Sequence, residues 1–294
     1  MFTRLLSSLL FNFARLLSFL PFNLLYIKSS FFAFFIFRVI GYRKNVIIQN
    51  LCRSFPELKY NEISSLTRGF YKHFSDVFIE VVKGISLSHA EFVKRYRVEN
   101  IELINQYHQQ DKTVIGLTGH IGNWEWLGLL PSLEKDPVYT LYKPLRSKVA
   151  EGVITKIRSR FGMRLLSMSN AARFILNTAN KRNFYIFIGD QSPTRVDNAS
   201  EFNFLNQKTT FFTGGAKLAI ATKSAIVYIS IKKMSRGYYT LKLIPIDYQP
   251  ILNETSNKLK AENFILSEYA RFLEKDIRDN PVAWLWSHKR WKHP

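Results

Sequence analysis

Thr113–Thr118 (TVIGLT) and the segment it enters, Gly119–Glu125 (GHIGNWE), decide the fold. The first six residues predict a short buried strand. The glycines that follow allow a tight turn around His120, because glycine adopts backbone angles that other residues avoid. Asn123 is a suitable N-cap, so a helix is expected to begin here with Glu125 in its first turn. In open α/β sheets functional side chains gather beyond the carboxyl ends of strands, where this segment falls.

Apolar runs and stretches of helical spacing alternate on both sides of this segment. Further strands are expected at 138–142, 184–188, 225–232 and 238–246. Helices are expected at 145–161, 171–179, 214–222 and 259–277, and residues 57–110 have a polar, helical pattern. This alternation predicts an α/β fold, in which helices flank a central mixed sheet that is largely parallel in its first half.

The N-terminus is both apolar and basic, since residues 1–56 contain Lys and Arg but no Asp or Glu. On a helical wheel of residues 4–20 the polar side chains fall within roughly a 140° arc. This pattern suits a helix that lies in a membrane interface with its polar arc toward the headgroups. A perpendicular span would place Arg15 near mid-bilayer, at a cost of about 2.5–3.5 kcal/mol, and the next apolar run, 31–40, is too short to cross alone. We expect an interfacial or re-entrant anchor, with a true span as the alternative.

Three parts of the chain follow from these patterns. Residues 1–45 are expected to form a membrane anchor of amphipathic and hydrophobic helices. Residues 46–112 are expected to form a helical segment that packs on the core, and residues 113–294 the α/β core itself.

The charge balance points to an anionic partner. Lys and Arg number 42 against 22 Asp and Glu, a formal net charge of +20, which suits nucleic acid, an anionic lipid surface or an acidic protein. The C-terminal stretch WSHKRWKHP mixes aromatic and cationic residues. This combination is typical of segments that bind nucleic acid and of segments that lie at a membrane interface. The acid-free N-terminus favours the membrane, so no nucleic acid is expected.

Composition also indicates which chemistry to expect. Cys52 is the single cysteine, so no intrachain disulfide forms, which is compatible with a catalytic face in the cytoplasm. His288 and His293 are too isolated to predict a metal site, and neither a phosphate-binding loop nor a dinucleotide fingerprint is present. We therefore expect no metal and no organic cofactor.

His120 and Glu125 are the residue types that activate a hydroxyl. A neutral imidazole can take the proton of an attacking alcohol, and a carboxylate on the other ring nitrogen would fix the tautomer and stabilise the imidazolium. The nucleophile would belong to the substrate, because the chain has no G-x-S-x-G elbow. On residue type alone, a histidine that is satisfied by its own loop is an equal alternative.

The same residues resemble a known family. His120 followed by Glu125 resembles the H-x4-(D/E) pattern of glycerolipid acyltransferases, and GHIGNWEW resembles the late acyltransferases of lipid A biosynthesis, which belong to the lysophospholipid acyltransferase superfamily. Four more blocks resemble that family in the same order: Asn50–Glu57 (NLCRSFPE), Tyr142–Leu145 (YKPL), Gly189–Gln191 (GDQ) and Trp286–Lys292 (WSHKRWK). Their order along the chain makes the resemblance specific.

This resemblance implies a membrane-bound acyltransferase with a glycerolipid-acyltransferase-like fold. A fatty acyl chain would pass from an acyl thioester, expected to be that of acyl-carrier protein, to a hydroxyl of a lipid A precursor or a related glycolipid. His120 would be the general base and Glu125 its orienting carboxylate. The enzyme would sit on the inner membrane with its catalytic face in the cytoplasm. Both expected partners, the carrier protein and the phosphorylated glycolipid, are anionic, as the net charge requires.

Four further residues are expected to bind substrate: Arg158 and Asp190, which match family residues of the active site, together with Asn123 and Lys143. Lys143 would clamp a phosphate of the acceptor. Each has a simpler alternative, since Arg158 and Lys143 also suit a solvated surface, and Asp190 suits a turn. Two alternatives remain for the function: transfer to another membrane lipid, or non-catalytic binding of anionic lipid.

Overall fold

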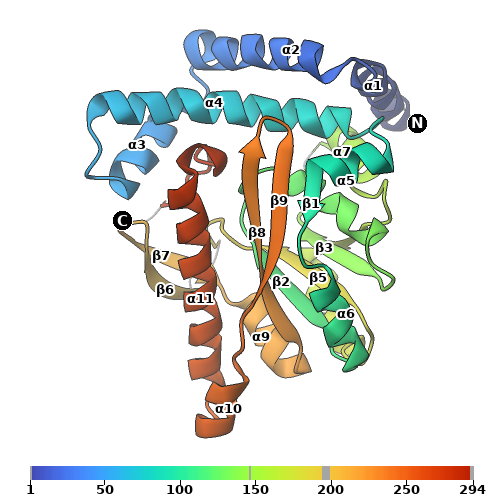
Figure 1. Cartoon of the computed structure of the whole chain (residues 1–294), viewed down its shortest axis with the longest axis vertical. Coiled ribbons are helices and arrows are strands. Elements are labelled where there is room, and N and C mark those ends of the chain that lie inside the picture. Colours follow the sequence, from blue (N-terminus) through green and yellow to red (C-terminus); the bar gives the residue numbers. More distant parts are fainter. Residues whose placement is uncertain (1, 146, 194–198, 292–294) are drawn as a thin grey trace.

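A seven-stranded sheet forms the centre of the molecule, with the strand order β1-β9-β8-β2-β5-β3-β4 (Figure 1). Neighbouring strands are parallel except for the antiparallel pair β8–β9, so the predicted mixed α/β sheet is confirmed. A separate antiparallel hairpin is formed by β6 and β7. The strands are β1 (Tyr96–Val98), β2 (Val114–Thr118), β3 (Val138–Tyr142), β4 (Arg164–Ser167), β5 (Phe184–Ile188), β6 (Ala199–Phe204), β7 (Gln207–Phe212), β8 (Ala225–Ser235) and β9 (Tyr238–Pro245).

This computed structural model describes residues 2–145, 147–193 and 199–291. Lys292, the last residue of the C-terminal block, and His293 lie outside the described residues. The helices of the core and of the segment before it are α3 (Lys44–Ser54), α4 (Tyr60–Lys83), α5 (His89–Arg95), α6 (Glu102–Gln109), the 3₁₀ helix η2 (Trp124–Ser132), α7 (Lys148–Arg158), α8 (Met168–Asn177), α9 (Gly214–Thr222), α10 (Gln249–Thr255), α11 (Lys258–Asp279) and the 3₁₀ turn η4 (Pro281–Ala283).

β2 lies at the centre of the sheet between β5 and β8, and all five of its residues are buried. A strand covered on both faces reads as a continuous apolar run, which is why this stretch does not alternate. Gly116 leaves room for its neighbours, because an added Cβ would lie 2.7 Å from Ile229 Cδ1 and 2.8 Å from Phe184 Cε2. The strand that carries the turn at His120 is therefore held rigidly by its surroundings.

Helices cover the sheet in continuous layers. α8 packs against β3 and β4 and also against α9, and α11 packs against α9 and β8. Tyr228 of β8 stacks on Phe272 of α11, with ring centroids 5.4 Å apart, and its hydroxyl donates to Asp276 at 2.8 Å. The long helix α4 crosses one end of the sheet, next to the turn of the β8–β9 hairpin (Figure 1).

Three sheet elements were not expected from the sequence. β1 and β4 are the two edge strands, only three and four residues long, and this length is too short to show an alternating pattern. The hairpin β6–β7 was also missed. Because β1 starts at Tyr96, the sheet begins before the expected core boundary at residue 113.

The N-terminal layer is formed by α1 (Phe2–Ser18) and α2 (Phe22–Phe35), which a π-helical turn, η1 (Ile36–Ile40), continues. Pro21 separates the two helices. Within the described residues, Phe22–Ile40 is one helical stretch that is long and apolar enough to cross a membrane. The run 31–40, expected to be too short to cross, is thus part of a longer helix.

Two serines of the polar arc of α1 point toward the protein instead of toward headgroups, whereas Asn12 and Arg15 of the same arc are exposed. Ser7 and Ser18 are buried against the rest of the protein, and Ser7 lies against Gly152 of α7. The outward face carries large apolar side chains such as Phe13, 60% exposed, and Leu16, 70% exposed. The polar arc therefore packs in part on the protein instead of facing headgroups, because serine is small enough for close helix contact. An outward apolar face suits lipid more than water.

α2 lies lengthwise on α4, so that the two helices run along each other in Figure 1. Leu25 and Ala33 of α2 are buried in this contact. Two hydrogen bonds add to it, from Ser29 Oγ to Asp76 at 2.7 Å and from Tyr26 Oη to Glu80 at 3.0 Å. This apolar helix is thus attached to the protein along its length.

Glu134, in the loop before β3, gives the first prediction. Burial, followed by the nearby charge of Asp136, raises the pKa of Glu134 to about 7, and neither carboxylate oxygen has a hydrogen-bond partner. Between about pH 4.5 and pH 7 the folded protein therefore keeps a proton on Glu134 that the unfolded chain has released. The free energy of unfolding falls as the pH rises through this range. Glu134→Gln should remove about 1–2 kcal/mol of this loss, less than full burial would give because the residue is partly exposed. Urea unfolding at pH 5 and pH 8 measures the effect, and an unchanged difference between the two pH values would contradict it.

Candidate active site

The turn after β2 is fixed by the C-terminal segment of the chain. Ile121 forms an antiparallel bridge with Trp284. On either side, Leu285 N donates to the carbonyl of His120 at 3.1 Å and Gly122 N donates to the carbonyl of Ala283 at 3.0 Å. Gly122 has a φ of 59°, which glycine adopts without strain. The backbone around His120 is thus held on both sides.

His120 pairs with Asp190, which follows β5. The ring Nδ1 lies 2.6 Å from Asp190 Oδ1. The second oxygen, Oδ2, accepts from the His120 main-chain N–H at 2.8 Å and from the Trp284 indole N–H at 2.7 Å. Asp190 is 3% exposed and His120 lies at the edge of a cleft. A buried carboxylate therefore fixes both the main chain and the ring of the histidine.

The charge of Asp190 determines the tautomer of His120. Burial alone would raise the pKa of Asp190, but the adjacent His120 ring and the donated hydrogen bonds outweigh it and lower the pKa to about 2. An ionised carboxylate only accepts hydrogen bonds, so Nδ1 must carry the proton. Nε2 is then the free base, and it faces Gln191, whose Nε2 lies 3.4 Å away. This is the arrangement that a general base requires.

Glu125 does not contact the His120 ring, and the expected pair is wrong. After Asn123 the chain enters η2, which directs Glu125 toward α7. There the Arg158 guanidinium donates twice to the carboxylate, at 2.7 and 2.6 Å. Asp190, which was expected to bind substrate, occupies the place expected for Glu125. The paired geometry of a guanidinium and a carboxylate explains why Glu125 is held away from the ring.

A cleft of about 440 Å³ opens at the edge of the sheet beside His120. Its polar lining includes His120, Glu125, Lys143, Arg158 and Gln191. Its apolar lining includes Leu127, Leu141, Pro144, Leu145, Met163, Met168 and Ile188. The cleft thus offers charged groups together with apolar surface that a hydrocarbon chain can contact.

The remaining expected residues divide between the cleft and the interior. Lys143 is exposed at the cleft, as a residue that contacts substrate would be. Asn123 is fully buried. Its side chain accepts from Trp126 N at 3.3 Å, which confirms the predicted N-cap, and donates to Glu80 at 2.8 Å. Asn123 therefore has a structural position instead of the expected contact with substrate.

Buried groups of α4 support the catalytic turn from behind. Glu80 accepts from Asn123 and from the Tyr239 hydroxyl, both at 2.8 Å, and burial raises its pKa. His73 Nε2 lies 3.2 Å from the carbonyl of Gly122. Burial, and then the charge of Lys233, lower the pKa of His73 to about 3, so this ring is neutral. Sequence reasoning did not identify any of these supporting residues, because nothing in the spacing of α4 distinguishes them from ordinary polar positions.

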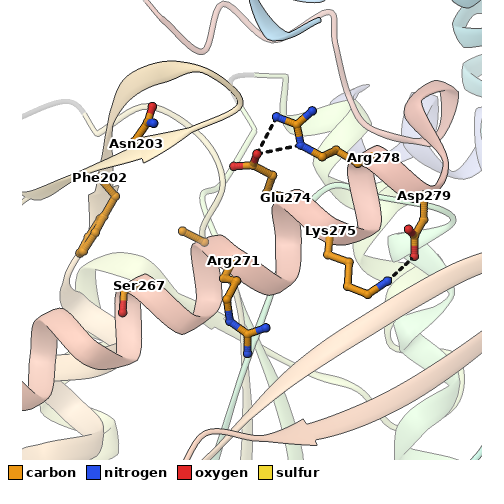
Figure 2. Close-up of a pocket in the computed structure, with 9 residues that line it drawn as sticks. Phe202, Asn203, Ser267, Arg271, Glu274, Lys275, Arg278 and Asp279 are labelled. Carbon is orange, nitrogen blue, oxygen red and sulfur yellow. Dashed lines mark hydrogen bonds and ion pairs between the residues drawn. The ribbon is translucent and has the colours of Figure 1, made fainter.

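A second cleft, of about 540 Å³, lies between the outer face of α11 and β6 (Figure 2). Its charged side chains pair with one another along the helix, Arg278 with Glu274 at 2.7 Å and Lys275 with Asp279 at 2.9 Å. Figure 2 shows these pairs pointing along the helix surface. Neither a histidine nor an unpaired carboxylate lines this cleft, so it does not offer the base that the His120 cleft provides.

A mixed sheet whose central strand leads to the His120–Asp190 pair, beside a cleft lined by both charged and apolar side chains, defines a protein equipped to deprotonate an alcohol next to a hydrocarbon chain. The family described as bacterial lipid A biosynthesis acyltransferase matches residues 1–293, and the chain belongs to this family. The protein is therefore an acyltransferase.

Two relatives illustrate the similarity. The chain is 21% identical over 251 residues to the lipid A biosynthesis palmitoleoyltransferase of Escherichia coli (strain K12). The matched region covers 85% of this chain and 79% of the relative. The lipid A biosynthesis acyltransferase of Shigella flexneri is similar to the same extent, with the same identity and coverage.

Trp284 gives a prediction for the site. Trp284→Phe keeps a buried ring but removes the indole N–H that donates to Asp190. With one donor lost, the carboxylate is held less firmly, and we expect kcat to fall about ten-fold with little change in KM, as for the loss of one hydrogen bond to a buried charge. The matched control is Trp286→Phe, which loses a hydrogen bond to the carbonyl of Pro281 instead. Equal losses of kcat in both variants would show that Trp284 acts only through stability.

Proposed function

We propose that this protein transfers a fatty acyl chain from acyl-carrier protein to a hydroxyl of a lipid A precursor or a closely related glycolipid. The observation that carries the proposal is the His120–Asp190 pair, which leaves Nε2 at a cleft lined by both charged and apolar side chains. Membership of the lipid A acyltransferase family supports this choice of donor and acceptor class.

The reaction follows from this geometry in two steps. Nε2 of His120 takes the hydroxyl proton as the oxygen attacks the thioester carbonyl, and the imidazolium that forms is stabilised by the Asp190 carboxylate 2.6 Å from Nδ1. The tetrahedral intermediate then collapses, the C–S bond breaks as the ester C–O bond is kept, and Nε2 returns the proton to the departing thiolate. Atoms and charge balance without any cofactor.

The developing oxyanion needs donors, and two main-chain N–H groups of the turn at His120 are already in use. His120 N donates to Asp190 and Gly122 N donates to Ala283, so these N–H groups, which lie in the turn where such donors would be sought, are occupied. The Gln191 side-chain amide lines the cleft 3.4 Å from His120 Nε2. We assign the stabilisation of the oxyanion to this amide.

Arg158 and Lys143 suit the anionic part of the acceptor. Burial would lower the pKa of Arg158, but the hydrogen bonds and charge of Glu125 outweigh it and raise the pKa, so the guanidinium stays charged in the cleft. Lys143 adds a second, exposed cation to the same cleft. In this proposal Glu125 orients Arg158 toward the acceptor phosphate and does not touch the base.

The outward face of the N-terminal layer supports attachment to the inner membrane. Leu16 and Phe31 are each at least 70% exposed, which suits contact with lipid. Because α2 is attached along α4, a helix lying in the interface is favoured over a free span. The catalytic cleft would then open toward the cytoplasm, where an acidic carrier protein meets a chain with a net charge of +20.

The test of the proposal compares His120→Ala and Asp190→Asn with the unaltered enzyme. Removal of the base, or of the carboxylate that fixes its tautomer, should lower kcat by about 10²–10⁴-fold while the protein stays folded. The measurement uses purified protein, acyl-carrier protein loaded with a fatty acid, and a lipid A precursor, with the product identified by mass spectrometry. Unchanged transfer by His120→Ala would exclude this site. Transfer that occurs only to another membrane lipid would identify a different acceptor.

The Gln191 amide can be tested on its own. Gln191→Glu replaces the donor with a carboxylate of the same size, which would repel the oxyanion, so kcat should fall about 10²–10³-fold with a smaller change in KM. Gln191→Asn keeps the amide and should retain more activity. If both variants keep full kcat, the oxyanion is stabilised elsewhere.

A further inference from the structure

A third cleft, of about 350 Å³, lies between α1 and α7, apart from the cleft that holds His120. Three cations line it: Arg15 of α1, Lys156 of α7 and Arg160 just after α7. The remaining lining is apolar and consists of Phe11, Ile85 and Ile157. Among the residues that the structure describes, no carboxylate lines this cleft.

The positive charge of this cleft is not balanced within the described part of the chain. Neither Arg15, Lys156 nor Arg160 forms an ion pair there with a carboxylate. Lys156 Nζ lies over the Phe11 ring, 4.9 Å from its centroid, and Arg160 donates to the carbonyl of Gly84. Arg158, on the same helix, is by contrast fully paired with Glu125. The α1 side of α7 thus keeps its charge available.

Helical spacing explains why these cations meet. Phe11 and Arg15 are four residues apart and therefore share one face of α1. Lys156 lies in α7 and Arg160 follows the end of that helix, and both line the cleft. Like charges that share a cleft repel each other unless an anion lies between them. The contact of the two helices brings all three cations to one cleft.

The cleft also lies beside the apolar face of α1. Phe13, 60% exposed, and Leu16 flank Arg15 in sequence and point outward. In Figure 1 α1 and α2 lie together on one side of the molecule, with α7 beneath α1. A lipid whose chains cover this apolar face would bring its headgroup to the level of the three cations.

We propose that this cleft binds the phosphate of an anionic membrane lipid, whose acyl chains lie along the exposed face of α1. The site is separate from the reaction centre, because Arg158 faces the His120 cleft while Lys156 and Arg160 face this one. Occupancy would hold α1 against α7 and fix the enzyme at the membrane surface. The inference depends on α1 lying at that surface, and it does not depend on the proposed reaction.

Binding to vesicles tests the site. The double variant Arg15→Gln with Lys156→Gln removes two exposed cations of the cleft. The matched control, Lys28→Gln with Arg38→Gln, removes two exposed cations of α2 and η1 that lie outside it. On vesicles of phosphatidylcholine with phosphatidylglycerol, the cleft variant should bind about 25-fold more weakly than the unaltered protein, about five-fold for each cation. The control should lose no more than about three-fold. On pure phosphatidylcholine the three proteins should bind alike.

Each other outcome is decisive. Equal losses in the two double variants would show diffuse attraction to the surface and would overturn the proposal, and so would no loss in either. Inorganic phosphate, compared with chloride at matched ionic strength, should displace the unaltered protein from the anionic vesicles more than it displaces the cleft variant. If phosphate binds the cleft while vesicle binding does not depend on the cations, the ligand is soluble and the lipid assignment is wrong. The same measurements in a His120→Ala background keep this result independent of catalysis.

Discussion

The buried carboxylate of Asp190 is the interaction on which the active site depends. It accepts hydrogen bonds from the ring and the main chain of His120 and from Trp284, and so it joins the ends of β2 and β5 to the C-terminal segment. A buried charge is costly unless its hydrogen bonds are satisfied. Here that requirement itself determines the geometry, because the ionised carboxylate accepts from Nδ1–H, and in the neutral ring Nε2 is then the unprotonated nitrogen.

The rest of the site contains two charged pairs, and each carboxylate has its own partner. Asp190 pairs with His120, and Glu125 pairs with Arg158 in the same cleft. If Glu125 contacted the ring instead, Arg158 would remain as a half-buried cation without a partner, while Asp190 would lose the ring N–H and keep only its hydrogen bonds from His120 N and Trp284. Each carboxylate therefore pairs with the group that would otherwise lose its partner in the protein interior.

Much of the fold could be predicted from the sequence, because the buried strands are continuous apolar runs and the helices between them have regular spacing. β2, β3 and β5 begin and end within one residue of the expected positions. The edge strands could not be predicted from three or four residues.

The histidine was found from its motif, but its partner was not, since proximity in sequence favoured Glu125. The sheet contains the missing information: β2 and β5 are adjacent and parallel, so the residues that follow them meet at one edge.

The N-terminal layer and the turn at His120 share one buried group. Glu80 of α4 accepts from Tyr26 of α2 through one oxygen, and from Asn123 and Tyr239 through the other. Asn123 in turn caps η2, the helix that positions Glu125. A displacement of α2 along α4 would leave one oxygen of this carboxylate unpaired in the interior, at a cost of about 1–3 kcal/mol. This long apolar helix is therefore not an independent tether, because its position and the geometry of the turn at His120 are stabilised by the same carboxylate.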